Sequence, residues 1–126
     1  MKNKHMLNWI KSAEQGNVTA QSNLGLMYAK GDGVPRDYKT AVKWYRLAAE
    51  QGDVSAQFNL GLMYAKGRGV PQNDMYAYMW GNIVASNGDK DGGKLRDFIA
   101  KEMTPAQIEK AQNLARECVA KKYKGC

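Results

Sequence analysis

Two lysines that lie 36 residues apart, Lys30 and Lys66, stand where the residue types favour binding chemistry. A lysine ammonium group attracts carboxylates, and apolar side chains beside it add hydrophobic contact with a partner. Each lysine ends a stretch that also holds an asparagine and a leucine at matching positions. The two matching sets are Ser22, Asn23, Leu26 and Lys30, and Phe58, Asn59, Leu62 and Lys66. This pattern predicts a surface that binds a protein or peptide with an acidic group.

The two cysteines, Cys118 and Cys126, lie eight residues apart and are the second candidate for chemistry. A tetrahedral metal site needs further Cys or His ligands, and the single histidine, His5, is far away in sequence. The pair is therefore either a disulfide that ties the last helical turn to the tail or two free thiols. A disulfide favours an oxidising space such as a bacterial periplasm, with the chain as a mature form that lacks its signal. Free thiols favour the cytoplasm, which is the default interpretation of the printed sequence.

Catalytic patterns are sparse. One histidine leaves little for His-based catalysis, and no acid pair stands beside an evident apolar pocket. The glycine-rich segments GDGVP (31–35) and GRGVP (67–71) lie between predicted helices, so they indicate turns rather than a phosphate-binding loop. We therefore predict a protein that is not an enzyme and has no catalytic residue, cofactor or metal.

The charge of the 126-residue chain is concentrated at its ends. The formal net charge is +7, yet residues 12–89 hold seven basic and seven acidic side chains. Residues 1–11 add three lysines without an acid, and residues 90–126 hold nine basic residues against five acidic ones. A basic face across the central architecture is not evident, so no nucleic-acid partner is expected. No apolar stretch approaches the roughly 20 residues that span a bilayer, so no membrane span is predicted.

An internal repeat of 36 residues organises the sequence. Residues 20–35 (AQSNLGLMYAKGDGVP) align with residues 56–71 (AQFNLGLMYAKGRGVP), and fourteen of the sixteen positions are identical. A period of this size is typical of helical arrays. We predict one domain over residues 1–126, composed of a partial repeat (8–16), two full repeats (17–52 and 53–88), and a degenerate repeat with a capping helix (89–126).

Each full repeat predicts two helices. Asn17 and Asp53 are suitable N-caps for the first helix of each unit, and the glycines after Lys30 and Lys66 end it. Asp37 and Asn73 are suitable N-caps for the second helix. The glycines at 25 and 61 stand inside the first helices, at a cost of about 1 kcal/mol each relative to alanine. They indicate a close approach between helices, with Trp44 and Trp80 as the facing aromatic residues.

The repeat decays after residue 88. Apolar spacing predicts a short helix from about 91 to 101, and Thr104-Pro105-Ala106-Gln107 has the pattern of a capping box with proline at the first helical position. The second helix is expected to reach about residue 122. Because the last unit of an array exposes apolar surface, the simplest role of this final pair is a cap.

The spaced positions of the first unit resemble the Sel-one-like repeat (SLR) family, a relative of the tetratricopeptide repeats. The matching residues are Ala20, Leu24-Gly25, Tyr28, Gly31-Asp32-Gly33-Val34, Asp37, Ala41, Trp44, Ala48-Ala49 and Gly52. The resemblance implies an all-α fold: an α-α superhelix, or short solenoid, of antiparallel helix pairs with a C-terminal capping helix pair. The last segment also looks like the C-terminal extension that follows many bacterial repeats of this family.

The second unit departs from the family pattern at two places. Asn73 replaces the aspartate, and Gly81 stands where the first unit has an aromatic residue after Trp44. Packing in the second unit is therefore either looser or directed toward the C-terminal region.

The resemblance also implies that the first helix of each unit lines a concave wall. At about 100° per residue, Leu26 and its counterpart Leu62 fall on the side of the helix away from the pattern residues. We predict an adaptor that binds an extended or helical peptide on this wall, and Phe58, which replaces Ser22, favours that interpretation. The alternative is that the C-terminal helices or the next unit cover Leu26 and Leu62.

Two other functions stay open as alternatives. Some disulfide-rich repeat proteins of this superfamily are linked to β-lactam or peptidoglycan chemistry, but the Ser-x-x-Lys motif and the cysteine pairs in every unit are missing here. Lys121, Lys122 and Lys124 are suited to contact phosphate, although lysines near a helix C-terminus also stabilise its dipole. The oligomeric state is left open.

Overall fold

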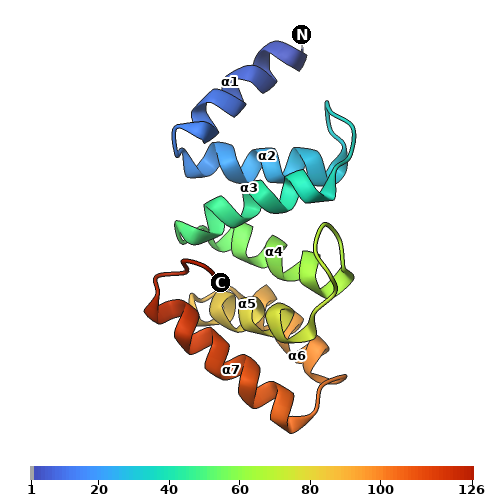
Figure 1. Cartoon of the computed structure of the whole chain (residues 1–126), viewed down its shortest axis with the longest axis vertical. Helices are drawn as coiled ribbons and strands as arrows, with labels where there is room; N and C mark the ends of the chain where they lie inside the picture. The colour runs from blue at the N-terminus through green and yellow to red at the C-terminus, as the bar shows by residue number, and fades with distance from the viewer. Residues whose placement is uncertain (1) are drawn as a thin grey trace.

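The computed structural model describes residues 2–126, with side chains described from His5 onward. This part of the chain holds seven helices and no strand, which confirms the predicted all-α fold. Figure 1 shows them stacked along one long axis, with α1 at one end and α7 at the other. The helices are α1 (Lys2–Glu14), α2 (Val18–Lys30), α3 (Tyr38–Glu50), α4 (Val54–Lys66), α5 (Asp74–Ser86), α6 (Lys90–Ala100) and α7 (Pro105–Ala120). None of the described helices is long and apolar enough to cross a membrane.

The predicted caps set the ends of the repeat helices. The Asn17 side chain accepts a hydrogen bond from the backbone N–H of Ala20 at 2.9 Å, and Asp53 does the same for Ala56 at 2.9 Å. At the other end, Gly31 and Gly67 adopt left-handed φ angles of 71° and 66°. A non-glycine residue is strained in this conformation, so glycine ends the helix here at low cost.

The first helix of each unit is also tied to the helix before it by a buried glutamine. Gln21 Nε2 donates to the carbonyl of Ala13 at the end of α1, and Gln57 Nε2 donates to Ala49 at the end of α3. These glutamines are 4% and 0% exposed. Because a buried amide is stabilising only when it is paired, they fix how successive units stack.

The close approach at Gly25 differs from the prediction. A Cβ placed on Gly25 would lie 2.5 Å from Cδ1 of Tyr45, so the ring of Tyr45 covers this glycine. The prediction that Trp44 faces Gly25 is wrong, although Trp44 is buried in the smaller core cluster with Met6 and Leu24. Neighbouring residues of α3 point about 100° apart, and here it is Tyr45 that reaches α2.

The close approach at Gly61 has two partners. A Cβ on Gly61 would lie 3.2 Å from Cβ of Trp80 and 3.1 Å from Cδ2 of Leu95. Trp80 therefore contacts Gly61 as predicted, but a leucine from α6 shares the position. Gly81 stands where Tyr45 does in the first unit, and Leu95 fills the space that this ring would take.

The C-terminal helices are packed differently from the repeat pairs. Both α6 and α7 pack against α5 rather than against each other (Figure 1). The contact with α6 is so close that a Cβ on Gly92 would lie 2.6 Å from the carbonyl oxygen of Gly81 and 2.6 Å from the backbone nitrogen of Ala85. The capping box at Thr104 and Gln107 is formed as predicted. The cap therefore holds the last repeat helix from two sides.

Candidate functional site

A surface cavity of about 190 Å³, here called the α2–α4 cavity, lies at the C-terminal ends of α2 and α4 beside the start of α3. Its apolar and aromatic lining comprises Leu26, Ala29, Tyr38, Tyr45, Leu62 and Met63. Its polar lining comprises Lys30, Asn59, Lys66 and Arg68. The two repeat units thus build one cavity together, because α2 and α3 belong to the first unit and α4 to the second.

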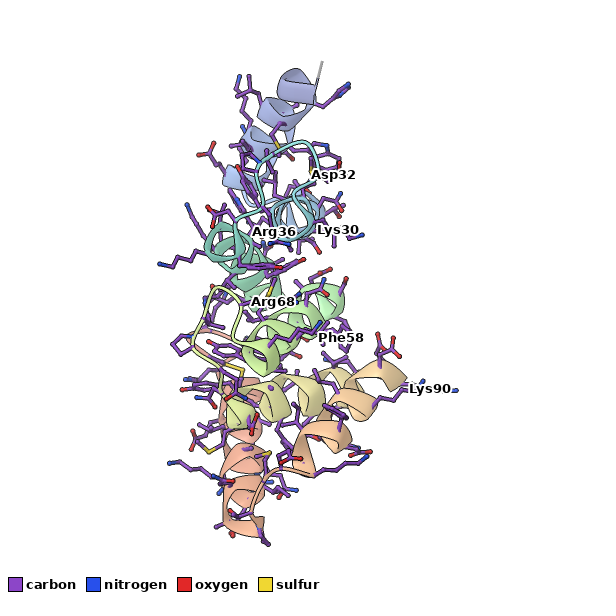
Figure 2. All side chains as sticks on the ribbon, turned by 90° about the vertical axis from the view of Figure 1, so that its right-hand side faces the viewer. Lys30, Asp32, Arg36, Phe58, Arg68 and Lys90 are labelled. Atoms are coloured by element: carbon purple, nitrogen blue, oxygen red, sulfur yellow. A yellow bond between two sulfur atoms is a disulfide. The ribbon has the colours of Figure 1, made fainter. Side chains whose placement is uncertain are left out.

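Five of the eight residues predicted for the partner surface line this cavity: Leu26, Lys30, Asn59, Leu62 and Lys66. The other three, Ser22, Asn23 and Phe58, lie outside its lining, and each is half-buried nearer the start of its helix. Phe58 packs against the main core cluster. Figure 2 labels Phe58 on α4, and Lys30 at the end of α2.

The apolar part of the cavity is open to solvent. Leu26 is 40% exposed, so neither the C-terminal helices nor the next unit covers it. Leu62 is half-buried and contacts the core. At the cavity's floor, burial raises the pKa of Tyr45 to about 12, so its hydroxyl is neutral at physiological pH. A neutral, largely apolar floor suits an uncharged side chain.

The rim of the cavity is positively charged. Within the described residues, Arg96 and Asp97 form the only ion pair, so Lys30, Lys66 and Arg68 have no acidic partner among them. Figure 2 shows Arg68 and Arg36 near the two loops that connect the helices of each unit. These exposed cations give the rim a positive potential that attracts anionic groups.

Tyr38 stands between the two loops and contacts both arginines. The guanidinium carbons of Arg36 and Arg68 each lie 5.2 Å from the centre of its ring. A cation over an aromatic face is held by about 0.5–1 kcal/mol at exposed sites. The tyrosine therefore positions Arg68 at the cavity rim without neutralising its charge.

Tyr38, Tyr45 and Arg68 also line the cavity, although the sequence did not predict them there. One signal was available for Arg68, because it is one of two differences in the sixteen-residue match and replaces Asp32. The other difference is Phe58 in place of Ser22. No comparable signal marks the tyrosines, which reach the cavity from the following helix.

The carboxylate of Asp37, next to Tyr38 in the sequence, is already hydrogen-bonded within the N-cap of α3. Asp37 accepts hydrogen bonds from the hydroxyl and the backbone N–H of Thr40, at 2.8 and 3.2 Å. These bonds, that from the hydroxyl first, hold the pKa of Asp37 below its ordinary value. The carboxylate thus caps α3 and does not pair with the rim cations.

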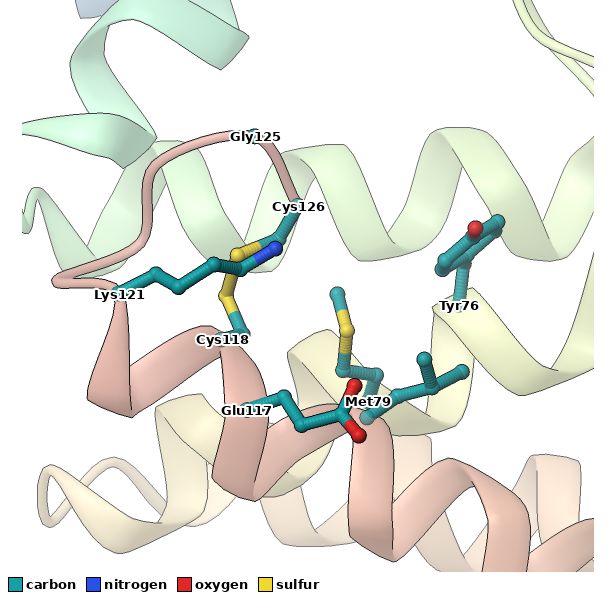
Figure 3. A pocket seen from close by; sticks show the side chains of 8 residues that line it. Tyr76, Met79, Glu117, Cys118, Lys121, Gly125 and Cys126 are labelled. Carbon is teal, nitrogen blue, oxygen red and sulfur yellow. A yellow bond between two sulfur atoms is a disulfide. The ribbon is translucent and has the colours of Figure 1, made fainter.

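The cysteines meet beside α5, where the C-terminus of the chain turns back toward the middle of the array (Figure 1). Cys118 and Cys126 form a disulfide with an S–S distance of 2.11 Å and a Cα–Cα distance of 5.7 Å. They line a second cavity of about 120 Å³ with Tyr76, Met79 and Glu117 (Figure 3). Across the described residues, no group of three or more His, Cys, Asp or Glu side chains is placed to hold a metal ion.

Comparison with known proteins adds the following. The Sel1 repeat family matches residues 18–53 and 54–89. A protective antigen present in uropathogenic Escherichia coli strains, described as displaying an SLR fold, superposes with a TM-score of 0.89 and 34% identity over 94% of this chain and 25% of that one. A Sel1 repeat protein from Oxalobacter formigenes superposes with a TM-score of 0.68 and 38% identity over 71% of this chain and 26% of that one. The chain thus spans about a quarter of the length of these two proteins. No curated protein matches the sequence.

Proposed function

This chain belongs to the Sel1 repeat family, and from that premise we propose that it is a non-enzymatic adaptor that binds a protein or peptide segment along the first helices of its repeats. Sel1 repeats are commonly protein-interaction modules. The observation that carries the proposal is the α2–α4 cavity, where an apolar floor adjoins Lys30, Lys66 and Arg68. This combination favours a partner with an apolar side chain and acidic groups.

The size of the cavity favours a side chain over a small-molecule ligand. Sites for drug-sized molecules are about 300–1,000 Å³, whereas this cavity holds about 190 Å³. Burying one leucine-sized side chain contributes about 1.5–3 kcal/mol, which is typical of an anchor residue. We therefore propose that one apolar side chain of the partner lies between Leu26 and Leu62.

The charges of the rim favour acidic residues next to this anchor. Lys30 and Lys66 occupy equivalent positions on α2 and α4, and both line the same cavity. In an extended chain, residues two and four positions apart point to the same side, so two acids four residues apart would face both lysines with the anchor midway between them. Arg68 is suited to bind one carboxylate through two parallel hydrogen bonds.

Two asparagines favour an extended partner over a helical one. Asn23 and Asn59 are half-buried at equivalent positions, and neither side chain forms a hydrogen bond with the described part of the protein. A peptide helix satisfies its own backbone groups, whereas an extended segment presents free N–H and C=O groups. The two amides are therefore suited to hold the backbone of an extended segment.

The test is a peptide array of decamers in which two glutamates, four residues apart, bracket a leucine midway between them. Wild-type protein is expected to retain these decamers, and Leu62→Asp to weaken the affinity at least tenfold, which corresponds to about 1.4 kcal/mol. Leu47→Asp, which alters a leucine of α3 that is 38% exposed, is the matched control and is expected to bind normally. Equal retention of every decamer by wild-type protein and folded Leu62→Asp would overturn the proposal.

The charge contribution has its own comparison. Lys66→Glu is expected to weaken binding about tenfold and to reduce its dependence on salt, because one rim cation is replaced by an anion. Lys110→Glu makes the same change at an exposed position of α7 and serves as the control. If both variants bind alike while Leu62→Asp does not bind, the apolar anchor stands and the acidic partner is excluded.

A further inference from the structure

We infer that the Cys118–Cys126 disulfide is a reversible redox latch that joins residues 121–126, here called the C-terminal strap, to α7 and so holds them against the end of α3. The inference is independent of the proposed function, because the cavity beside the disulfide shares no lining residue with the α2–α4 cavity. It rests on where the strap leads, on its backbone conformation and on the unequal exposure of the two cysteines.

The strap connects the cap to the first repeat. It leaves α7 after Ala120 and turns back toward the middle of the array (Figure 1). The backbone N–H of Gly125 donates to a carboxylate oxygen of Glu50 at 3.2 Å. The ring of Tyr123 lies against Gly52, since a Cβ placed on that glycine would be 3.6 Å from the ring. The strap thus reaches the end of α3, although α7 itself packs on α5.

The backbone of the strap adopts a conformation that its residues disfavour. Lys122 and Tyr123 have φ angles of 54° and 68°, and they are the only non-glycine residues with positive φ in the described chain. Such residues persist in the left-handed region where surrounding contacts hold them. The contacts here are the backbone hydrogen bond from the Tyr123 N–H to the carbonyl of Cys118, the packing of Tyr123, one hydrogen bond to Glu50, and the covalent bond to Cys118.

The two sulfur atoms differ in access. Cys118 is 1% exposed, whereas Cys126 is partly exposed at the free end of the strap. Both line the cavity of about 120 Å³ shown in Figure 3. An attacking thiolate needs a path to a sulfur atom, so the reaction should occur at Cys126.

The reductant is a dithiol, which reacts with the disulfide by thiol–disulfide exchange. Its thiolate attacks the Sγ of Cys126, the Cys118–Cys126 bond breaks, and Cys118 leaves as a thiolate that takes up a proton. The second thiol of the reductant then attacks the reductant's own sulfur in the mixed disulfide and releases Cys126, which is also protonated. Two electrons and two protons have reached the cysteines, and the dithiol has become a disulfide.

Reduction of the disulfide should loosen the strap and leave the distant part of the array unchanged. The strap loses its covalent hold, so the hydrogen bonds from the N–H groups of Tyr123 and Lys124 to Cys118 and Lys121 should open more often. The wall of the second cavity formed by Gly125 and Cys126 would move away from Tyr76 and Met79. Helix α1 lies at the opposite end of the array (Figure 1) and should keep its protection.

The experiment treats the intact protein with dithiothreitol in native buffer and follows thiol alkylation and amide hydrogen exchange by mass spectrometry. We expect two alkylated cysteines without denaturant, exchange at least tenfold faster in residues 121–126, and unchanged exchange in α1. Alkylation that appears only when the whole chain unfolds would overturn the inference. Unchanged exchange in the strap of the reduced protein would overturn it as well.

Two variants separate the latch from general loosening. Cys126→Ser, which leaves the buried Cys118 in place, should exchange its strap as fast as reduced wild-type protein and should not respond to dithiothreitol. Glu50→Ala should speed strap exchange while the disulfide stays intact. Glu14→Ala, the same change 36 residues earlier on α1, is the control and should have no effect on the strap. A strap that stays protected in Cys126→Ser contradicts the inference.

Discussion

The two repeat units share most of their sequence, yet the same glycine meets different partners in each. In the first unit, Gly25 of α2 is covered by the ring of Tyr45 from its own second helix. In the second unit, Gly61 is covered by Trp80 and by Leu95, which comes from α6. The first unit therefore completes its core with its own residues, whereas the core of the second unit includes a side chain from the C-terminal cap.

The absence of an aromatic ring at position 81 also allows a closer contact between two helices. Gly81 replaces Tyr45, and without a side chain at this position α6 can approach α5 until Gly92 almost touches the backbone. Interlocking at close range needs glycine on both helices, because any Cβ here would collide with main-chain atoms. The departure from the repeat pattern is thus directed toward the C-terminal region, which was one of the two outcomes that the sequence left open.

The largest expected effect tests how each unit closes its core. Tyr45→Ala should lower the free energy of unfolding by about 4 kcal/mol, because it empties the space over Gly25. Leu95→Ala should cost about 3 kcal/mol, since Leu95 does the same for Gly61. Urea denaturation followed by circular dichroism measures both. If Leu95→Ala costs no more than Leu47→Ala on the exposed side of α3, the second unit does not depend on the cap.

The next effect separates two adjacent glycines of α6. Gly92→Ala should cost about 2 kcal/mol, because its Cβ would lie 2.6 Å from backbone atoms of Gly81 and Ala85. Gly93→Ala is the matched control, since its Cβ would find its closest neighbour at 3.6 Å. The control should gain about 1 kcal/mol from the better helix propensity of alanine. Thermal unfolding measures both variants. Equal shifts of their midpoints would contradict the close crossing of α5 and α6 at Gly92.

Much of the repeat could be predicted from sequence because its signals are local. A cap such as Asn17 and a stop such as Gly31 act within one helix, and the second unit repeats both. The partner of Gly25 could not be predicted, because periodicity places Trp44 and Tyr45 on adjoining faces without giving the rotation of α3. The packing of α6 on α5 could not be predicted either, because the repeat pattern ends where α6 begins. In the sequence, only the glycines at 81 and 92 indicate where the two helices meet.

The candidate site was predicted on one side only. Helical phase brought Leu26, Lys30, Leu62 and Lys66 to one surface, because the repeat carries equivalent residues to equivalent places. It gave no information on what lies between neighbouring units. Arg68 and the two tyrosines of the cavity are positioned by packing between a loop and the preceding unit, which depends on contacts far apart in sequence.

A smaller effect concerns the buried glutamines that join successive units. Gln21 Oε1 accepts a hydrogen bond from Gln51 Nε2 at 2.8 Å, but the matching oxygen of Gln57 is buried without a partner among the described residues. The residue equivalent to Gln51 is Asn87, which is one methylene shorter. Asn87→Gln should therefore raise the free energy of unfolding by about 1 kcal/mol, the net contribution of one hydrogen bond.

The reverse exchange controls this prediction. Gln51→Asn should lower stability by about 1 kcal/mol, because it leaves the Gln21 oxygen without its partner as in the second unit. Urea titrations with equal slopes would show that both changes act on the folded state. A destabilising Asn87→Gln would show that the longer side chain does not reach α4.

The smallest effect concerns the second-helix caps, Asp37 and Asn73, which occupy equivalent positions. The pKa of Asp37 is lowered by hydrogen bonds from Thr40, the hydroxyl first and then the backbone N–H. A carboxyl whose pKa is lower in the folded state stabilises the fold above its unfolded pKa of about 3.9, and this contribution is lost as pH falls through the folded pKa. Asp37→Asn should leave stability at pH 7 nearly unchanged, because both residues cap well, and should weaken the loss of stability in acid.

The reciprocal variant makes this test specific to the cap. Asn73→Asp places a carboxylate at the start of α5, where it would accept from the backbone N–H of Tyr76 as Asn73 does now at 3.1 Å. The hydroxyl of Tyr76 is at the far end of its ring and does not bond the cap as the Thr40 hydroxyl does, so the pKa of the new carboxyl should fall less than that of Asp37. Midpoints of thermal unfolding between pH 7 and about pH 2.5 should therefore decline less for Asp37→Asn than for wild type, and slightly more for Asn73→Asp. Parallel curves for all three proteins would show that the Thr40 hydroxyl contributes nothing to the cap.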